Sequence, residues 1–164
     1  MSENNSKKSL PIYGVGPIYG FGISAVSILF IVLAKKLFHT GTISMLKIPF
    51  IILGILFILG GIVIWISAVI LAKIDDGIKS NTLVTNGIYG WCRNPIYTAI
   101  TFVNIGALLM ANNLWLLLLP FCYWVFMTVL MKRTEEKWLY DMFGEEYTEY
   151  CKNVNRCIPW KKRK

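Results

Sequence analysis

The chain has 164 residues, of which 55% are hydrophobic, and its 17 Lys and Arg against 9 Asp and Glu give a net charge of +8. The length predicts a single domain, residues 1–164, and the apolar fraction, gathered in blocks, exceeds that of ordinary soluble domains and indicates a membrane protein. One histidine and four cysteines without a C-x-x-C spacing argue against a metal centre or a disulfide framework, so we expect no metal.

Four apolar segments follow one another, and each is predicted to be a transmembrane helix. They cover residues 17–34, 48–72, 95–111 and 114–131. The second segment contains Gly54, Gly60 and Gly61, which suit a close approach between membrane helices. The last two segments are separated only by Asn112 and Asn113, so we expect a tight hairpin.

Two prolines help to define these helices. Pro95 suits the first turn of the third helix, where its missing N–H has no partner to lose. Pro120 lies inside the fourth segment and predicts a kink or a short break there.

After residue 131 the pattern changes, and large apolar side chains recur at intervals of three and four with charges between them. They are Trp138, Leu139, Met142, Phe143, Tyr147 and Tyr150. This spacing predicts an amphipathic helix within residues 132–160, which Gly144 is placed to break in two. Such a helix either lies on the lipid headgroups or folds back over the bundle. The predicted fold class is all-α: a polytopic membrane helical bundle of about four transmembrane helices plus a C-terminal amphipathic cytoplasmic helix.

The basic residues predict the orientation. The N-terminus, residues 73–94 and the segment after residue 131 hold 14 of the 17 Lys and Arg, against 3 in residues 35–47. Cytoplasmic loops carry such an excess, so both termini and residues 73–94 are predicted to be cytoplasmic. The protein would lie in the cell membrane of a prokaryote or the endoplasmic reticulum of a eukaryote. Topology and anionic lipid explain the positive charge, so membrane lipids are expected partners and nucleic acid is not.

Two polar clusters fall on this predicted cytoplasmic side. Residues 81–97 read N-T-L-V-T-N-G-I-Y-G-W-C-R-N-P-I-Y, and residues 133–136 read R-T-E-E. The first is too rich in hydrogen-bonding groups for a simple connector and predicts one wall of a polar site. No G-x-G-x-x-G indicates a Rossmann nucleotide site, and His39 falls on the other side, which argues against a His-activated nucleophile.

The charged candidates in these clusters have both functional and structural interpretations. Arg93 could hold a carboxylate through forked hydrogen bonds, or it could be a membrane-edge arginine that reaches the headgroups. A glutamate of the R-T-E-E cluster that faces the bundle would need a cation or donors and would then be a functional residue. A solvated glutamate would pair with Lys132 or Arg133.

The order of the motifs carries more information than any one of them. The loop L-V-T-N-G-I-Y-G-W-C-R-N-P-I-Y precedes an apolar hairpin, R-T-E-E-K-W-L, F-G-E-E-Y-T-E-Y and a closing R-C-I-P. This series resembles the isoprenylcysteine carboxyl methyltransferase family, and phospholipid methyltransferases share the wider pattern. The resemblance covers about residues 81–160, and the first two apolar segments match only as hydrophobic helices.

The resemblance implies an integral membrane methyltransferase that uses S-adenosyl-L-methionine and a lipidic or hydrophobic methyl acceptor. The implied cofactor-binding residues are Asn81, Thr82, Leu83, Val84, Tyr89, Asn94, Pro95, Ile96, Tyr97 and Glu135. The resemblance also implies that Arg93 organises the site or pairs with a carboxylate. Because no cytoplasmic histidine is available, Glu136 is the candidate base, and Arg93 and Glu136 are the predicted catalytic residues.

Two departures from the family pattern concern the acceptor. Members that methylate prenylcysteine carry a substrate-side arginine just before the glutamates, where this chain has Met131, so the nearby Arg133 becomes the candidate substrate residue. The commoner Arg-His-Pro is Arg-Asn-Pro here, and Asn94 cannot act as a base near neutral pH. Because a sulfonium methyl is already activated, the protein chiefly aligns the reactants. A carboxylate acceptor, such as that of a prenylated cysteine, would need no base.

Three other functions remain open from the sequence. A membrane NADPH-dependent reductase of the steroid-reductase-like type resembles the family in the same region, but its cofactor phosphates would require more basic residues than Lys73, Lys79 and Arg93. A phospholipid amine N-methyltransferase would first have to deprotonate its acceptor. A non-catalytic membrane scaffold would bind neither cofactor.

Overall fold

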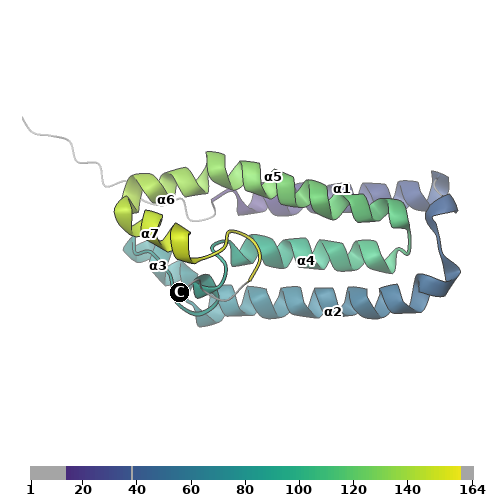
Figure 1. Cartoon of the computed structure of the whole chain (residues 1–164), viewed down its shortest axis with the longest axis horizontal. Coiled ribbons are helices and arrows are strands. Elements are labelled where there is room, and N and C mark those ends of the chain that lie inside the picture. The colour runs from purple at the N-terminus through teal and green to yellow at the C-terminus, as the bar shows by residue number, and fades with distance from the viewer. Residues whose placement is uncertain (1–13, 38, 160–164) are drawn as a thin grey trace, which may run out of the picture.

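The computed structural model describes residues 14–37 and 39–159. The predicted cytoplasmic location of the two termini concerns residues outside this range. The described chain is helical apart from its loops and one isolated bridge between Cys92 and Asn155, which confirms the all-α prediction. Four long helices form an elongated bundle, and three short helices gather at one end (Figure 1).

The helix bounds follow the predicted segments closely. The long helices are α1 (Gly16–Leu37), α2 (Lys47–Ile66), α4 (Pro95–Met110) and α5 (Leu119–Arg133), and the short ones are α3 (Ile74–Ser80), α6 (Glu135–Phe143) and α7 (Glu145–Asn153). Short 3-10 turns occupy His39–Gly41, Ser44–Leu46, Gly87–Gly90 and Leu114–Leu118, and α2 continues into a π-helical turn, Ser67–Leu71. Pro95 opens α4 and Pro120 lies in the first turn of α5, immediately after a 3-10 turn, so the predicted break is confirmed.

Within residues 14–37 and 39–159, three stretches are long and apolar enough to cross a membrane: Gly16–Leu37, Ser44–Leu71 and Leu114–Phe143. The fourth apolar helix, α4, is shorter, with 16 residues. These lengths and compositions indicate an integral membrane protein. The apolar part of the last stretch ends at Met131, because Lys132 and Arg133 form the final turn of α5, so α6 lies beyond the span.

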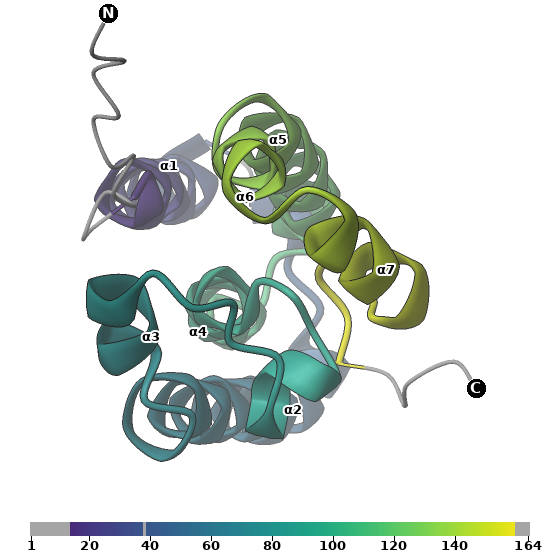
Figure 2. The ribbon, with the colours of Figure 1, turned by 90° about the vertical axis from the view of Figure 1, so that its left-hand side faces the viewer.

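Helix α4 is surrounded by the other long helices (Figure 2). Its most extensive packing is against α2, where a Cβ added to Gly54 would lie 2.7 Å from the Gly106 carbonyl oxygen and one added to Gly61 would lie 2.8 Å from that of Ala99. The prediction of close approach is therefore right for these two glycines. Gly60 faces only Phe102 at an ordinary 3.8 Å. The short connection after α4 is as predicted, but α4 packs more closely on α2 than on α5.

Polar pairs join α1 to α4 and α5 inside the bundle. The Tyr19 and Thr101 hydroxyls lie 2.6 Å apart, and those of Ser27 and Tyr123 lie 2.7 Å apart. Because an unpaired hydroxyl is unfavourable in a lipid environment, these bonds help to fix the rotation of α1 against its neighbours. The start of α1 lies at the charged end of the bundle, where the Val15 N–H bonds Glu135.

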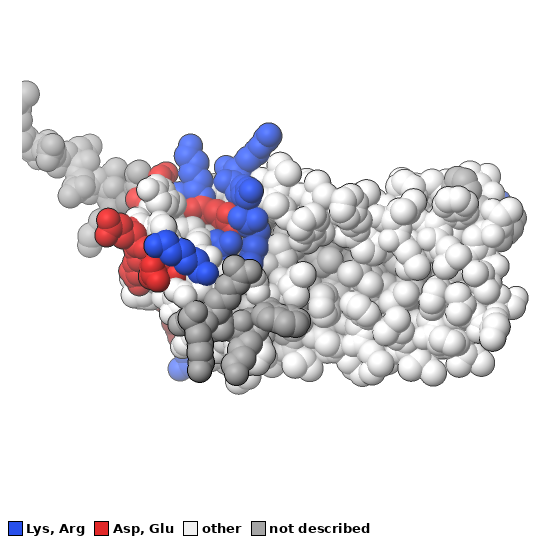
Figure 3. Space-filling view, in the orientation of Figure 1, with Lys and Arg blue, Asp and Glu red and all other residues white. Residues whose placement is uncertain are grey.

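The predicted amphipathic helix is two helices. Gly144, with φ +52°, separates α6 from α7 as predicted. Of the two arrangements that the sequence left open, the structure shows α7 folded back over the bundle: its Tyr147 is buried and the Tyr150 hydroxyl donates to the Tyr89 carbonyl at 2.6 Å. In the face shown, acidic and basic side chains gather at this end and the long body is uncharged (Figure 3).

Candidate functional site

A cavity opens at the charged end of the bundle, between the loop before α4, the first turn of α1 and helices α3, α6 and α7. Most of the predicted cofactor residues line it: Thr82, Leu83, Val84, Tyr89, Asn94, Pro95, Ile96, Tyr97 and Glu135. Arg93 lines it as well. Asn81 does not, because it caps α3 in a left-handed conformation with φ +52°. The structure thus brings together residues from both polar clusters.

Sequence reasoning missed several walls of the cavity. Gly14 and Gly16 come from the start of α1, Ile74 and Ile78 from α3, and Trp138, Leu139, Tyr147 and Tyr150 from α6 and α7. The C-terminal residues carried a detectable signal, since their periodic spacing placed them on one apolar face. The glycines carried none, because only the folded chain shows which segment covers the cavity.

Glu135 lies at the start of α6 and is partly buried. Its Oε1 accepts hydrogen bonds from the Tyr97 hydroxyl and, at 3.0 Å, from the Val15 backbone N–H. Its Oε2 has no hydrogen-bond partner among the described residues. Burial raises the pKa of this carboxyl, and the two hydrogen bonds partly oppose that rise. Of the two environments that the sequence left open, Glu135 therefore faces inward and meets donors.

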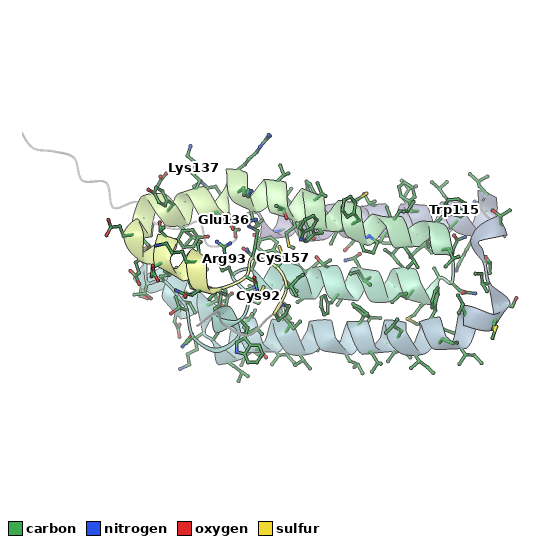
Figure 4. The ribbon with its side chains drawn as sticks, viewed as in Figure 1. Cys92, Arg93, Trp115, Glu136, Lys137 and Cys157 are labelled. Carbon is green, nitrogen blue, oxygen red and sulfur yellow. The ribbon has the colours of Figure 1, made fainter. Side chains whose placement is uncertain are left out.

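Glu136 points to a different set of partners. It receives two bonds from Arg156, Nε to Oε1 at 2.6 Å and Nη2 to Oε2 at 2.9 Å, and Arg93 Nη1 lies 3.4 Å from Oε1. All three side chains are at least three-quarters buried, with 24% exposure for Arg156 as the highest value. Arg93 and Glu136 lie next to each other at the charged end (Figure 4). Glu136 does not line the cavity, and its carboxylate is committed to two guanidinium groups.

Arg156 is held in place by the backbone around it. The segment 154–158, which we call the C-terminal strap, pairs with the start of α4: Arg93 N–H donates to the Asn155 carbonyl at 2.8 Å and Asn94 N–H to the Arg156 carbonyl at 3.1 Å. The Asn94 side-chain amide adds a second bond to the same Arg156 carbonyl at 3.1 Å. The asparagine of Arg-Asn-Pro therefore anchors the strap.

The Arg93 guanidinium contains a buried donor that none of the described residues satisfies. Its Nη1 contacts both Glu136 and the Cys151 sulfur, whereas its Nε is buried and has no hydrogen-bond partner among the described residues. A buried donor without a partner is unfavourable. The positive guanidinium as a whole belongs to the cavity wall and is suited to an anionic ligand. The membrane-edge interpretation of Arg93 does not apply, because the guanidinium is turned inward beside the Glu136 carboxylate, with 10% of the side chain exposed.

Two tyrosines complete the polar wall. Burial raises the pKa of Tyr89 and of Tyr150 above their usual value, so both hydroxyls are neutral near pH 7. Arg133 lies elsewhere: it is exposed in the last turn of α5 and does not line the cavity. In the described residues, no group of three or more His, Cys, Asp or Glu is arranged to hold a metal ion.

Comparison with known proteins identifies the family. The profile described as phospholipid methyltransferase matches residues 50–146, which is more than half of the chain and includes the predicted loop and Glu135. The chain belongs to the phospholipid methyltransferase family. Its family region begins in α2 and ends in α7, so it covers most of the cavity walls but not α1 or the C-terminal strap.

Several relatives within this methyltransferase family are named protein-S-isoprenylcysteine O-methyltransferase. The chain is 37% identical over 87 residues to the Mus musculus protein, which covers 49% of this chain and 29% of the mouse protein. It is 38% identical over 83 residues to the Saccharomyces cerevisiae protein, covering 50% and 34%, and 36% identical over 87 residues to the Homo sapiens protein, covering 49% and 28%. The chain thus matches about a third of the length of these curated relatives. No solved structure matches it.

Proposed function

We propose that the chain is a membrane methyltransferase that uses S-adenosyl-L-methionine and methylates a lipidic or hydrophobic acceptor. The observation that supports this most is the cavity itself: the 81–97 loop and the R-T-E-E cluster, separated by α4 and α5, contribute walls to one site. The family match and the isoprenylcysteine O-methyltransferase relatives favour methyl transfer over the reductase and scaffold alternatives.

The residues around the cavity fit the proposed cofactor. The amino-acid end of S-adenosyl-L-methionine carries a carboxylate and an ammonium. The Arg93 guanidinium, part of the cavity wall, would suit the carboxylate, and Glu135, whose Oε2 has no hydrogen-bond partner among the described residues, would suit the ammonium. The apolar walls and the Tyr89 ring suit a purine. Bound there, the cofactor would supply an activated methyl group, and the protein would hold it and exclude water.

The proposed placement in the membrane follows the predicted topology. Helix α4, although short, would be the fourth span, because it lies among the three longer ones (Figure 2). The charged end, with the cavity, would face the cytoplasm under the positive-inside rule. An acceptor with a long apolar chain would then reach the cavity from the bilayer.

The acceptor is proposed to be a carboxylate, as on a prenylated cysteine. An amine must lose a proton before it can attack. Arg156 and Arg93 neutralise Glu136, and Glu135 has Oε1 bonded to Val15 and Tyr97 and Oε2 assigned to the cofactor ammonium, so neither glutamate is left to take that proton. A carboxylate needs no such base. With tritiated cofactor, a farnesylcysteine analogue with a free carboxylate is expected to be methylated. Label in phosphatidylethanolamine instead would establish the amine alternative.

Cofactor binding is tested by titrating S-adenosylhomocysteine into the purified protein in detergent. Saturable binding is expected, and Glu135→Ala is expected to weaken it at least about tenfold, because a hydrogen bond to a charged group contributes roughly 1.5–3 kcal/mol. Asp141→Ala is the matched control, since Asp141 is exposed on the same helix and does not line the cavity. Folded protein that binds NADPH but not S-adenosylhomocysteine would exclude the proposal.

A further inference from the structure

The first turn of α1 contributes to the cavity although it lies outside the family region. Gly14 and Gly16 line the cavity, and the N–H of the buried Val15 donates to Glu135 Oε1 at 3.0 Å. Tyr19 N–H in turn bonds the Val15 carbonyl at 3.0 Å, so Val15 is the residue from which α1 begins to wind. Glu135, from α6, therefore occupies the N-terminal end of a helix more than a hundred residues earlier in the chain.

The contact leaves one carboxylate oxygen for a ligand. Val15 N–H and the Tyr97 hydroxyl both bond Oε1, and two donors from different helices fix the carboxylate in one orientation. Glu135 lines the cavity, and Oε2, which has no partner within the described residues, is the oxygen left for a ligand. A preoriented acceptor binds more tightly than a free one because its rotamers are already restricted.

Within this turn, position 14 strongly favours glycine. Gly14 has φ +51°, a conformation that side chains disfavour, and a Cβ there would overlap Glu135 Oε1. At Gly16 the nearest atom to an added Cβ is the Tyr97 hydroxyl oxygen, at an ordinary 3.7 Å, and at Gly22 nothing lies within 4 Å. The steric conflict that an added Cβ would cause therefore decreases from Gly14 to Gly16 to Gly22.

We propose that the turn 14–16 is a positioning element of the methyl donor site, which holds Glu135 through the Val15 N–H so that Oε2 is presented to the ligand. This proposal rests on the proposed function, because the ligand in question is the cofactor. It gives the turn 14–16 a part in cofactor affinity that is exerted through Glu135, and makes Gly14 a positioning residue.

The first test compares S-adenosylhomocysteine affinity in three variants. Gly14→Ala is expected to weaken binding about tenfold, Gly16→Ala by less than about threefold, and Gly22→Ala not at all. In a Glu135→Gln background, Gly14→Ala is expected to have little further effect, because coupled residues give non-additive changes. Equal effects of Gly14→Ala in both backgrounds would overturn the proposal.

A pH profile separates positioning from general damage. Glu135 must be ionised to bind, so affinity falls as the pH drops through its raised pKa. The groups that face the Glu135 carboxyl are the Tyr97 hydroxyl, Tyr89 and the Val15 N–H. Arg93 lines the same cavity but is paired with Glu136. Losing the Val15 bond raises the pKa of Glu135 further, so Gly14→Ala is expected to shift the acid limb to higher pH. If the fall in affinity at low pH occurs at the same pH in Gly14→Ala as in the wild type, the proposal is contradicted.

The same variants also separate this proposal from the proposed function. If the wild type binds no S-adenosylhomocysteine, the proposed function fails. A double-mutant cycle of melting temperatures, measured without ligand, still tests the coupling between Gly14 and Glu135. Non-additive melting temperatures for Gly14→Ala and Glu135→Gln support the contact, and additive ones overturn it. Binding by the wild type together with an additive cycle would reject the positioning role alone.

Discussion

Glu136→Gln is expected to lower the free energy of unfolding by roughly 3 kcal/mol and to abolish most S-adenosylhomocysteine binding. Removing the charge leaves Arg93 and Arg156 as two neighbouring, largely buried cations without a counter-ion. Breaking a buried pair by removing one partner is typically destabilising by about 3–5 kcal/mol. Arg93 would then turn away from Arg156 and lose its present position in the cavity wall.

The measurement is thermal unfolding in detergent together with the ligand titration. For a chain of this size, a loss of about 3 kcal/mol corresponds to a fall in melting temperature of roughly 6–12 °C. Glu149→Gln is the matched control, because Glu149 pairs with Lys152 on the surface of α7 and both side chains are about two-thirds exposed, 66% and 68%. Such a pair contributes little. Equal effects of the two substitutions would show that the Arg93–Glu136–Arg156 cluster does not hold the site.

The cluster also shows where prediction from the sequence stopped. Glu136 drew notice as a candidate base because it stands beside Glu135 in R-T-E-E, and the structure gives it two guanidinium partners instead. Arg156 belonged to the closing R-C-I-P, yet nothing in the sequence indicates that this strap returns to the start of α4. The pairing depends on backbone bonds between residues about sixty positions apart, which no local pattern encodes.

Other parts of the site were accessible from the sequence because local rules apply to them. The periodic spacing of apolar residues predicted α6 and α7, Gly144 indicated the break between them, and Pro95 indicated the start of α4. Motif order placed Glu135 and the 81–97 loop in one site. The turn at Gly14 escaped prediction, because its role comes from the rotation of α1, which buried hydroxyl pairs such as Tyr19 with Thr101 fix only in the assembled bundle.

The contact between α2 and α4 fixes the helix that carries Tyr97, and the adjacent glycines Gly60 and Gly61 allow this contact to be tested. Gly61→Ala is expected to destabilise the protein by roughly 1–3 kcal/mol, because its Cβ would lie 2.8 Å from the Ala99 carbonyl oxygen and 3.0 Å from Val103 Cγ2. Backbone cannot move aside as a flexible side chain can, so the helices must separate.

Gly60→Ala is the control one residue away, where the new Cβ meets only Phe102 at 3.8 Å. Both substitutions gain about 1 kcal/mol of helix propensity, so Gly60→Ala is expected to be neutral or stabilising in thermal unfolding. Ala99 lies close after Tyr97, which bonds Glu135, so Gly61→Ala is also expected to weaken S-adenosylhomocysteine binding a few-fold. If the two variants melt at the same temperature, α4 is not held in register by its close approach to α2, and the position of Tyr97 must depend on α1 and α5 instead.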